Sequence, residues 1–367
     1  MNAESKQFVE AAQVVLPCAE LDPTLEFFTE RLGFRVAAIY PADRPTTAVI
    51  SGYGLRVQLQ QNGVGAPGAI RLLCTDPASI ADGATELTAP NGTRIELVDA
   101  DPPIVVPPVQ PELVVTKHAD AKWGVGRAGM RYRDLIPSRL GGSFIASHIE
   151  IPTGGAVPDY VHFHKVRFQM IYNYKGWVRL AYEDQGPEFI MKAGDCVLQP
   201  PTIRHRVLEC SDGFEVVEIG CPAEHETFAD LEMTLPTGVT NPERDFRGQR
   251  FCRHDADKAT WHPFRLDGFD YRDIGIADAT DGLAGARVAR LSGTPSEKPV
   301  RHDAEFLFWF VLEGTFTLKC EAREDEPLGA RDSVVLPAGM AYALADCSSD
   351  LELLEVALPA RFETQIA

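Results

Sequence analysis

Several features that would place the 367-residue sequence in a specialised class are missing from it. It has no run of about 18 apolar residues, so we expect no membrane-spanning helix. Residues 1–20 have no apolar segment flanked by positive charge, so we expect no signal peptide. Low-complexity tracts are also absent, and 45% hydrophobic and 24% charged residues are typical of a globular protein. We therefore expect a cytoplasmic protein with no membrane partner.

Positive charge and paired cysteines are scarce as well. The chain has 35 Lys and Arg against 53 Asp and Glu, a net charge of -18, and its basic residues form no cluster. Nucleic acid is repelled by such a surface, and no segment resembles a DNA-binding helix-turn-helix. The eight cysteines are dispersed without a Cys-x-x-Cys pair, which predicts buried thiols and neither a disulfide framework nor a zinc ribbon. We exclude nucleic acid and expect a small-molecule substrate.

Proline-rich and polar breaks divide the chain into blocks. The segment 99–112 holds five prolines and excludes a regular element, and a second break lies at 235–250. Between them stand short β-like runs separated by Gly, Pro and Asp, without long helical periodicity. We predict a domain at 1–100, a Pro-rich linker at 101–124, a β-domain at 125–235, a linker at 236–250 and a last domain at 251–367.

The β-rich part contains an internal repeat. Tyr132-Arg133-Asp134 returns as Tyr271-Arg272-Asp273, and two later segments, KAGDCVLQPP (192–201) and VVEIGCPA (216–223), return as GARDSVVLPA (329–338) and LLEVALPA (353–360). Parallel spacing over about 90 residues predicts two copies of one β-domain. Because Glu218 returns as Glu355, we interpret this pair as structural.

Two histidines in the first copy have the spacing of metal ligands. His162 and His164 alternate on a predicted strand, so both imidazoles face the same side. A third imidazole from an adjacent strand would complete a site with open positions for water, substrate or oxygen. Histidine-rich sites of this kind suit Fe, Zn, Ni, Mn and Cu. We predict one divalent transition metal, and Fe is the metal we expect first.

The first copy resembles the cupin superfamily, and the two copies together resemble a bicupin. The matching positions within residues 125–362 are Gly155, His162-x-His164, residue 169, Gly176, Gly194-Asp195, Pro200 and His205. The resemblance implies two small jelly-roll barrels and metal ligands from the His-x-His pair, a Glu about five residues later and His205. Cupin barrels commonly pair, so the resemblance also implies a homodimer.

Gln169 departs from the family pattern, because it occupies the place of the Glu ligand. A Gln can coordinate through its carbonyl oxygen, but it is neutral and a poorer donor than a carboxylate. With three neutral histidines the metal keeps its double positive charge, which favours an anionic substrate such as an enolate, catecholate or carboxylate. Some cupin enzymes, including diketone-cleaving dioxygenases, work with three histidines and no acid. Gln169 is therefore either a fourth ligand or a hydrogen-bonding neighbour of the ligands.

Four further residues of the first copy are candidates for the cavity, with packing as the alternative for each. Gln199 precedes Pro200, where the family's strand points inward, and Asn173 shares the parity of Gln169. Arg167 would supply a cation, and His148 lies in the strand-like run FIASHIEI.

The second copy lacks these ligands. Val300 and His302 stand where His162 and His164 stand in the first copy, and Leu307 and Tyr342 replace Gln169 and His205. One imidazole, two apolar side chains and a phenol do not make a transition-metal site. We expect this barrel to have lost its metal and to serve packing or dimerisation.

The N-terminal block has a different pattern. Residues 12–60 read as a strand, a helix at 22–34 capped by Asp22 and ended by Gly33, and three further strands. This βαβββ pattern resembles the vicinal-oxygen-chelate (glyoxalase-like) superfamily, and residues 70–100 look like a truncated second module. Working members bind a metal with His and Glu, but this block has no histidine before His118. We expect a reduced α+β domain without catalysis, either a lid or an interface.

The predicted fold is mainly β, with two cupin barrels and a reduced glyoxalase-like domain. We predict an Fe(II)-type dioxygenase, an oxidoreductase that chelates a small anionic or enolisable substrate in the first barrel. Two alternatives stay open: a redox-neutral metal-dependent isomerase or lyase, and a non-enzymatic small-molecule-binding cupin. Dependence on oxygen would separate the first two.

Overall fold

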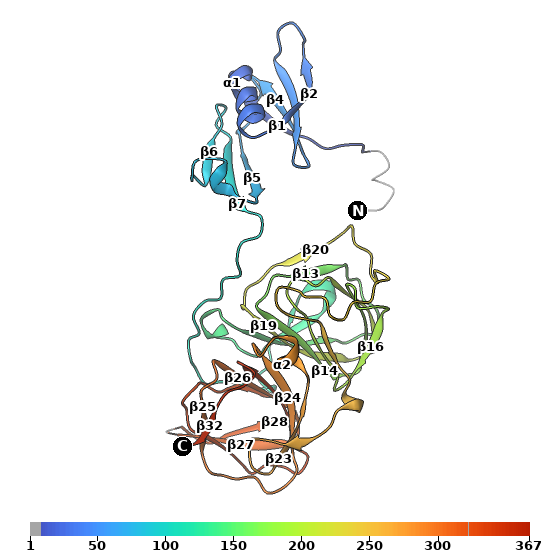
Figure 1. Cartoon of the computed structure of the whole chain (residues 1–367), viewed down its shortest axis with the longest axis vertical. Helices are drawn as coiled ribbons and strands as arrows, with labels where there is room; N and C mark the ends of the chain where they lie inside the picture. Colours follow the sequence, from blue (N-terminus) through green and yellow to red (C-terminus); the bar gives the residue numbers. More distant parts are fainter. Residues whose placement is uncertain (1–8, 322) are drawn as a thin grey trace. The chain divides into compact units, whose positions relative to one another are not determined.

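The computed structural model describes residues 9–321 and 323–367, which form two compact units (Figure 1). The first unit ends at Pro103, and the second runs from Ile104 to Ala367. Across the described residues, no helix is both long and apolar enough to span a lipid bilayer. The signal-peptide expectation concerns residues 1–20, of which 1–8 lie outside the described part.

The first unit contains two small sheets. In each of them the strand that comes first in the chain pairs in parallel with the strand that comes last. Its first sheet has the order β1-β4-β3-β2, and its second has the order β5-β7-β6. The second module therefore repeats the first with one strand fewer. The elements are β1 (Val14–Cys18), α1 (Leu21–Glu26), β2 (Arg35–Tyr40), β3 (Thr47–Gly52), β4 (Leu55–Gln61), β5 (Ala69–Cys74), β6 (Glu86–Thr88) and β7 (Arg94–Asp99).

The helix of this unit lies where the sequence predicts it, but its cap differs. Helix α1 continues as a π-helical segment, Phe27–Arg31, and the chain leaves it at Gly33, whose φ of 74° suits glycine. The N-cap is Glu20, without a side-chain hydrogen bond, so the expected Asp22 cap is wrong. The helix begins one residue earlier than predicted, at the buried Leu21, so Asp22 lies in its first turn.

The second unit contains two β-barrels, each made of a large and a small sheet. In the first barrel the large sheet has the order β21-β17-β14-β19-β11-β10-β9, and the small sheet has the order β16-β15-β18-β13-β20, with β12 paired to β18. The strands are β9 (Gly124–Val125), β10 (Arg131–Asp134), β11 (Ile145–Ile151), β12 (Gly155–Ala156), β13 (His162–His164), β14 (Phe168–Lys175), β15 (Trp177–Tyr182), β16 (Phe189–Lys192), β17 (Cys196–Leu198), β18 (His205–Cys210), β19 (Phe214–Cys221), β20 (Thr227–Ala229) and β21 (Cys252–His254).

The second barrel repeats this arrangement. Its large sheet has the order β22-β23-β24-β31-β26-β29-β8, and its small sheet has the order β28-β27-β30-β25-β32. The elements are β8 (Val114–Thr116), β22 (His262–Pro263), β23 (Phe269–Asp273), α2 (Ile276–Ala279), β24 (Gly285–Leu291), β25 (Val300–His302), β26 (Phe306–Glu313), β27 (Thr315–Cys320), β28 (Glu326–Gly329), β29 (Ser333–Val335), β30 (Tyr342–Ala345), β31 (Glu352–Leu358) and β32 (Thr364–Ile366).

The two barrels exchange one short strand. Strand β8, which precedes the first barrel in the chain, pairs with β29 of the second barrel. Strand β21 begins the second copy and pairs with β17 of the first barrel. The predicted boundaries place β8 in a linker and β21 in the last domain, so they do not describe this exchange. Each barrel is completed by the segment that leads into the other.

The repeated Tyr-Arg-Asp motif belongs to this junction. Arg133 is buried and donates to the backbone oxygen of Arg331, in the second barrel, at 2.6 Å. Arg272 donates to the backbone oxygen of Gly194, in the first barrel, at 3.1 Å. Gly194 and Arg331 hold matching places in the two copies, so each arginine ties its own barrel to the same turn of the other.

Apolar side chains fill the space between the barrels. Residues of both large sheets form one buried cluster, in which the rings of Phe144 and Phe306 stack with centroids 4.1 Å apart. All eight cysteines have free thiols, five of them buried and three half-buried. The absence of disulfides agrees with the sequence expectation, and the mainly β fold class is confirmed.

Candidate metal centre

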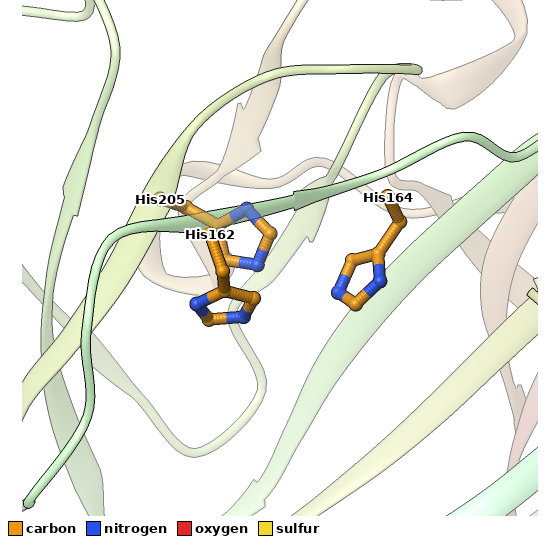
Figure 2. Close-up of side chains that lie close together, drawn as sticks. All are labelled: His162, His164 and His205. Carbon is orange, nitrogen blue, oxygen red and sulfur yellow. The ribbon is translucent and has the colours of Figure 1, made fainter. Parts of the chain in front are cut away.

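Three histidines meet inside the first barrel. His162 and His164 share one face of β13, and His162 lies directly opposite His205 of β18 in the strand register. One ring nitrogen from each lies within 4.8 Å of the others, and all three side chains are buried (Figure 2). Among residues 9–321 and 323–367, these histidines are the one group of three or more metal-binding side chains with such spacing.

The backbone fixes the tautomer of each histidine. The Nδ1 atoms of His162, His164 and His205 lie 2.8, 3.1 and 3.1 Å from the carbonyl oxygens of Tyr160, Glu226 and Ile203. A carbonyl only accepts, so each Nδ1 carries the proton and donates. The lone pair is then on Nε2, as a metal-ligating imidazole requires.

Burial keeps the three imidazoles neutral. It is the largest cause that lowers the pKa of His162, His164 and His205, and it brings the pKa of His164 to about 3. The other imidazoles and the positive charge of Arg127 lower the pKa of His205 further. A metal binds the neutral imidazole through its unprotonated nitrogen, so at neutral pH no proton has to leave. The donor set fits a divalent transition metal.

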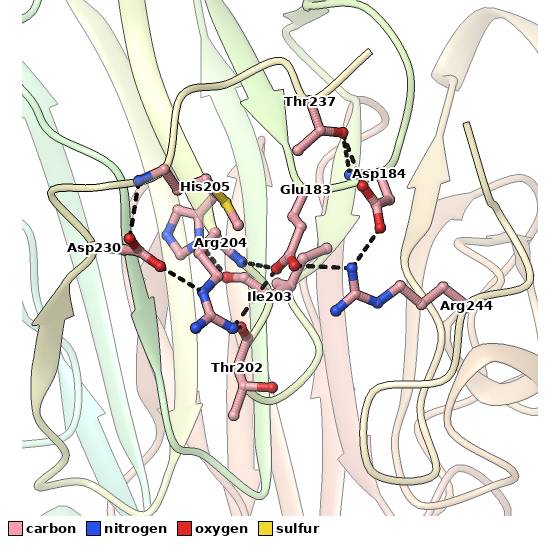
Figure 3. A network of polar contacts seen from close by, with 10 residues as sticks. Glu183, Asp184, Thr202, Ile203, Arg204, His205, Asp230, Thr237 and Arg244 are labelled. Carbon is pink, nitrogen blue, oxygen red and sulfur yellow. Dashed lines mark hydrogen bonds and ion pairs between the residues drawn. The ribbon is translucent and has the colours of Figure 1, made fainter. Parts of the chain in front are cut away.

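A polar network holds the turn that carries His205 (Figure 3). The Arg204 backbone N–H donates to Glu183, and its Nε donates to Asp230 at 3.1 Å. Arg244 donates to Glu183 at 2.8 Å and to Asp184 at 2.5 Å. Glu183 is buried, so these donors also satisfy a carboxylate that water reaches poorly. The network limits how far His205 can move.

The histidines open into a cavity of about 90 Å³. Its walls are largely apolar, and its polar lining residues other than the histidines are Arg127, Tyr132, Gln169, Tyr182, Gln199 and Glu218. A larger cavity, of about 780 Å³, lies in the first unit and is lined by no histidine. The metal chemistry belongs to the smaller cavity, because the donors converge there.

Gln169 and Gln199, two of the sequence candidates, both line this cavity. The Nε2 of Gln169 donates to Glu218 at 2.6 Å, so the carbonyl oxygen lies on the other side of its amide. The Nε2 of Gln199 donates to the Tyr182 hydroxyl at 2.8 Å. Glu218, which the sequence analysis interprets as structural, also lines the cavity.

Three other sequence candidates lie outside the cavity lining. Asn173 has the inward parity of Gln169, but it is not in the lining, and its side chain donates to the Met191 carbonyl at 3.1 Å. Arg167 forms a two-bond ion pair with Glu305 of the second barrel.

His148 is also excluded from the cavity. Its neighbour Ile149 lines the cavity, so alternation turns His148 to the opposite face of β11. There it donates to Glu215 at 2.9 Å and accepts from Arg133 at 3.1 Å, at the junction of the barrels.

Sequence reasoning missed Arg127. This residue begins the short 3₁₀ segment Arg127–Gly129 between β9 and β10, so no strand period assigns its direction. One guanidinium nitrogen (Nη2) is 3.0 Å from Nε2 of His162, and the other (Nη1) pairs with buried Asp159. Among the described residues that line the cavity, Arg127 is the one permanent cation and Glu218 is the one carboxylate.

The second barrel has the same register with different side chains. Val300 lies opposite Tyr342, as His162 lies opposite His205. His302 has both ring nitrogens in backbone hydrogen bonds, one from the Ala304 N–H and one to the Leu336 carbonyl. These positions therefore offer no group of three imidazoles like that of the first barrel.

The sequence matches no protein-family model, and no curated protein matches it either. Solved structures give the fold. The oxalate decarboxylase of Lactobacillus farciminis, in a formate complex, has a TM-score of 0.52 at 13% identity, over 72% of this chain and 90% of its own. A mutant salicylate 1,2-dioxygenase of Pseudoaminobacter salicylatoxidans, in complex with gentisate, has a TM-score of 0.53 at 14% identity, over 71% and 87%. The second unit therefore has the cupin fold, in its two-barrel form.

Proposed function

We propose that the first barrel is a mononuclear metal centre and that the protein is an Fe(II)-type dioxygenase acting on a small carboxylate or enolisable acid. The observation that carries this proposal is the set of three neutral histidines with Nδ1 protons on backbone carbonyls and Nε2 atoms turned into one cavity. A bound metal would supply a Lewis acid for the substrate and, as Fe(II), electrons for dioxygen.

The charge of the site favours an anion. Three neutral imidazoles add no negative charge to the metal's double positive charge. Arg127 beside them is balanced by Asp159, so Glu218 is the one unpaired carboxylate set against the metal in the cavity lining. The names of two structural neighbours agree with this preference, because they refer to oxalate, formate, salicylate and gentisate.

The cavity walls limit the size of the substrate. A cavity of about 150 Å³ is known to hold benzene, and this one measures about 90 Å³. We therefore propose an aliphatic acid of a few carbon atoms instead of an aromatic one. Apolar side chains such as Ile171, Val178 and Leu180 line the cavity and would exclude bulk water, which strengthens polar interactions inside.

The test combines metal analysis with oxygen uptake. Protein purified without a His tag should contain about one equivalent of metal by mass spectrometry, and an H162A/H164A variant should contain none. The iron-loaded protein should then consume oxygen with one member of a panel of two- to five-carbon carboxylates and oxo acids. Iron-loaded protein that turns over such a substrate equally well without oxygen would contradict the dioxygenase.

A redox-neutral lyase or isomerase is the second candidate, and Glu218 is the observation that favours it. Its carboxylate lines the cavity and holds the Gln169 amide, so it can accept or return a proton there. In this case Zn or Mn would support turnover, and activity would persist under anaerobic conditions.

We propose that the first unit is a reduced glyoxalase-like domain without a metal site of its own. Its paired βαβββ-like modules, the second lacking one strand, support this likeness. Two oxygen groups of its sheets are already engaged: Glu96 pairs with Arg71 at 2.8 Å and Arg94 at 2.6 Å, and the Gln58 oxygen accepts from Gln13. H162A/H164A protein that still binds a transition metal would contradict this proposal.

A cytoplasmic location and a homodimer are proposals of the same kind. Sedimentation of the full chain tests the second, and a monomer at micromolar concentration would contradict it.

A further inference from the structure

One metal-facing nitrogen of the centre is already in use. Nδ1 of His162 donates to the Tyr160 carbonyl, so Nε2 holds the lone pair and accepts from Arg127 at 3.0 Å. An imidazole nitrogen has one lone pair in the ring plane, so Arg127 and a metal cannot use it together. Binding of a metal therefore requires the guanidinium to leave this nitrogen.

The remainder of the guanidinium is anchored. Its other terminal nitrogen pairs with Asp159, whose side chain is buried and whose second oxygen accepts from the Val207 N–H at 3.0 Å. The guanidinium carbon lies 5.7 Å from the centroid of the Tyr160 ring. Because Asp159 holds one nitrogen of the guanidinium, the other nitrogen can turn away from His162 while the Arg127 side chain remains at the cavity.

The second barrel shows an arginine of similar position with a different partner. Arg265 lies six residues before Tyr271, and Arg127 lies five before Tyr132. Arg265 donates to Glu355 through two nitrogens, at 2.7 and 2.5 Å.

In the first barrel the matching carboxylate has another partner. Strand register equates Glu355 with Glu218, because they lie opposite the matching residues Trp309 and Ile171. Glu218 binds the Gln169 amide instead. No cavity carboxylate among the described residues therefore occupies the inward edge of Arg127, and an external carboxylate could take that place.

We propose that Arg127 is the anion-binding residue of the first barrel and that metal binding releases it for this role. The inference rests on the proposed metal centre and adds the group that recognises the substrate. The ligand class is a carboxylate, which matches the fork of a guanidinium and forms charge-assisted hydrogen bonds with it.

The first experiment measures Zn(II) affinity by competition with a chromogenic chelator in acetate-free buffer. R127A should bind zinc about tenfold more tightly than wild type, because no hydrogen bond to His162 has to break and a nearby positive charge is gone. R131A is the matched control: Arg131 lies on the adjacent strand β10, pairs with Glu150 at 2.5 Å and is not among the cavity-lining residues. Its zinc affinity should equal that of wild type.

The second experiment uses Co(II)-loaded protein and its visible spectrum. Acetate should change the spectrum of wild type and R131A at concentrations about tenfold lower than in R127A, and R127K should fall between them. Acetamide, which has nearly the same shape as acetate and no charge, should have no effect on any of them.

The outcomes separate the two proposals. If wild type and R127A both fail to bind zinc or cobalt, the metal centre itself is wrong, and this inference falls with it. If wild type binds metal while R127A shows unchanged zinc affinity, or an unchanged acetate response, the metal centre stands and the role of Arg127 is overturned.

Discussion

The two barrels of the second unit have the same strand register and opposite interiors. In the first barrel, the inward positions 162, 164 and 205 hold histidines that line a cavity, and the Nε2 of one of them, His162, accepts a hydrogen bond from Arg127. In the second, Trp309, Phe316, Leu336 and Tyr342 belong to one buried cluster that fills the inside. The jelly-roll scaffold therefore does not decide the chemistry, because a few inward side chains do.

The charged residues differ in the same way. Glu355 and Arg265 bind each other inside the second barrel, where Trp309 also donates to Glu355 at 2.8 Å. Their counterparts in the first barrel, Glu218 and Arg127, bind Gln169 and His162 instead. In the second barrel the arginine and the glutamate bind each other, and no ligand is needed to satisfy them. In the first barrel they do not bind each other, so the arginine can bind a ligand.

The largest predicted effect is loss of the metal from one barrel alone. H205A removes one of three ligands, so metal content should fall below about a tenth of an equivalent, with the fold retained by circular dichroism. H302A in the second barrel is the matched change and should leave metal content unaltered, because both nitrogens of His302 are in backbone hydrogen bonds. Metal loss from H302A would show that the barrels are not divided in this way.

The second prediction concerns stability. E355Q leaves the largely buried Arg265 guanidinium without its charged partner and should cost about 3–5 kcal/mol of unfolding free energy. E218Q, at the equivalent place, leaves only neutral Gln169 behind and should cost about 1 kcal/mol. Urea unfolding of both variants gives the comparison. Equal losses would mean that the two carboxylates have the same structural role.

The third prediction tests whether Gln169 is close enough to be a ligand. Q169E places a second carboxylate against Glu218, so like charges should lower the stability of the metal-free protein. The double variant Q169E/E218Q exchanges acid and amide and should bind Zn(II) about tenfold more tightly than wild type, since a carboxylate is the better ligand. A double variant with wild-type zinc affinity would place Gln169 outside the ligand set.

The repeat made the two-barrel architecture predictable, because the spacing of turns and strands returns along the chain. The strand exchange was not predictable. Strands β8 and β21 have three residues each, and nothing in so short a segment says which sheet it joins. Only the packing of one whole barrel on the other decides their partners.

The candidate site was predictable where strand alternation applies. It sends Gln169 inward, but it does not say which inward residues reach the cavity, because Asn173 shares that parity and is not in the lining. For His148 it could not choose between the cavity and the other barrel. Arg127 follows no strand period, because its direction is set by Asp159, 32 residues further along the chain.

The smallest predicted effect concerns the network behind His205. R204A removes the side chain that ties this turn to Asp230, so the imidazole should become less well oriented and Zn(II) affinity should fall about tenfold or less. R179A on the neighbouring strand removes a half-buried arginine paired with Glu188 and Glu209, and it should leave zinc affinity unchanged. The second barrel has Ala341 at the position before Tyr342, where the first has Arg204 before His205. The barrel that has no ligand to orient therefore lacks this arginine. An R204A variant with wild-type zinc affinity would indicate that the network serves stability alone.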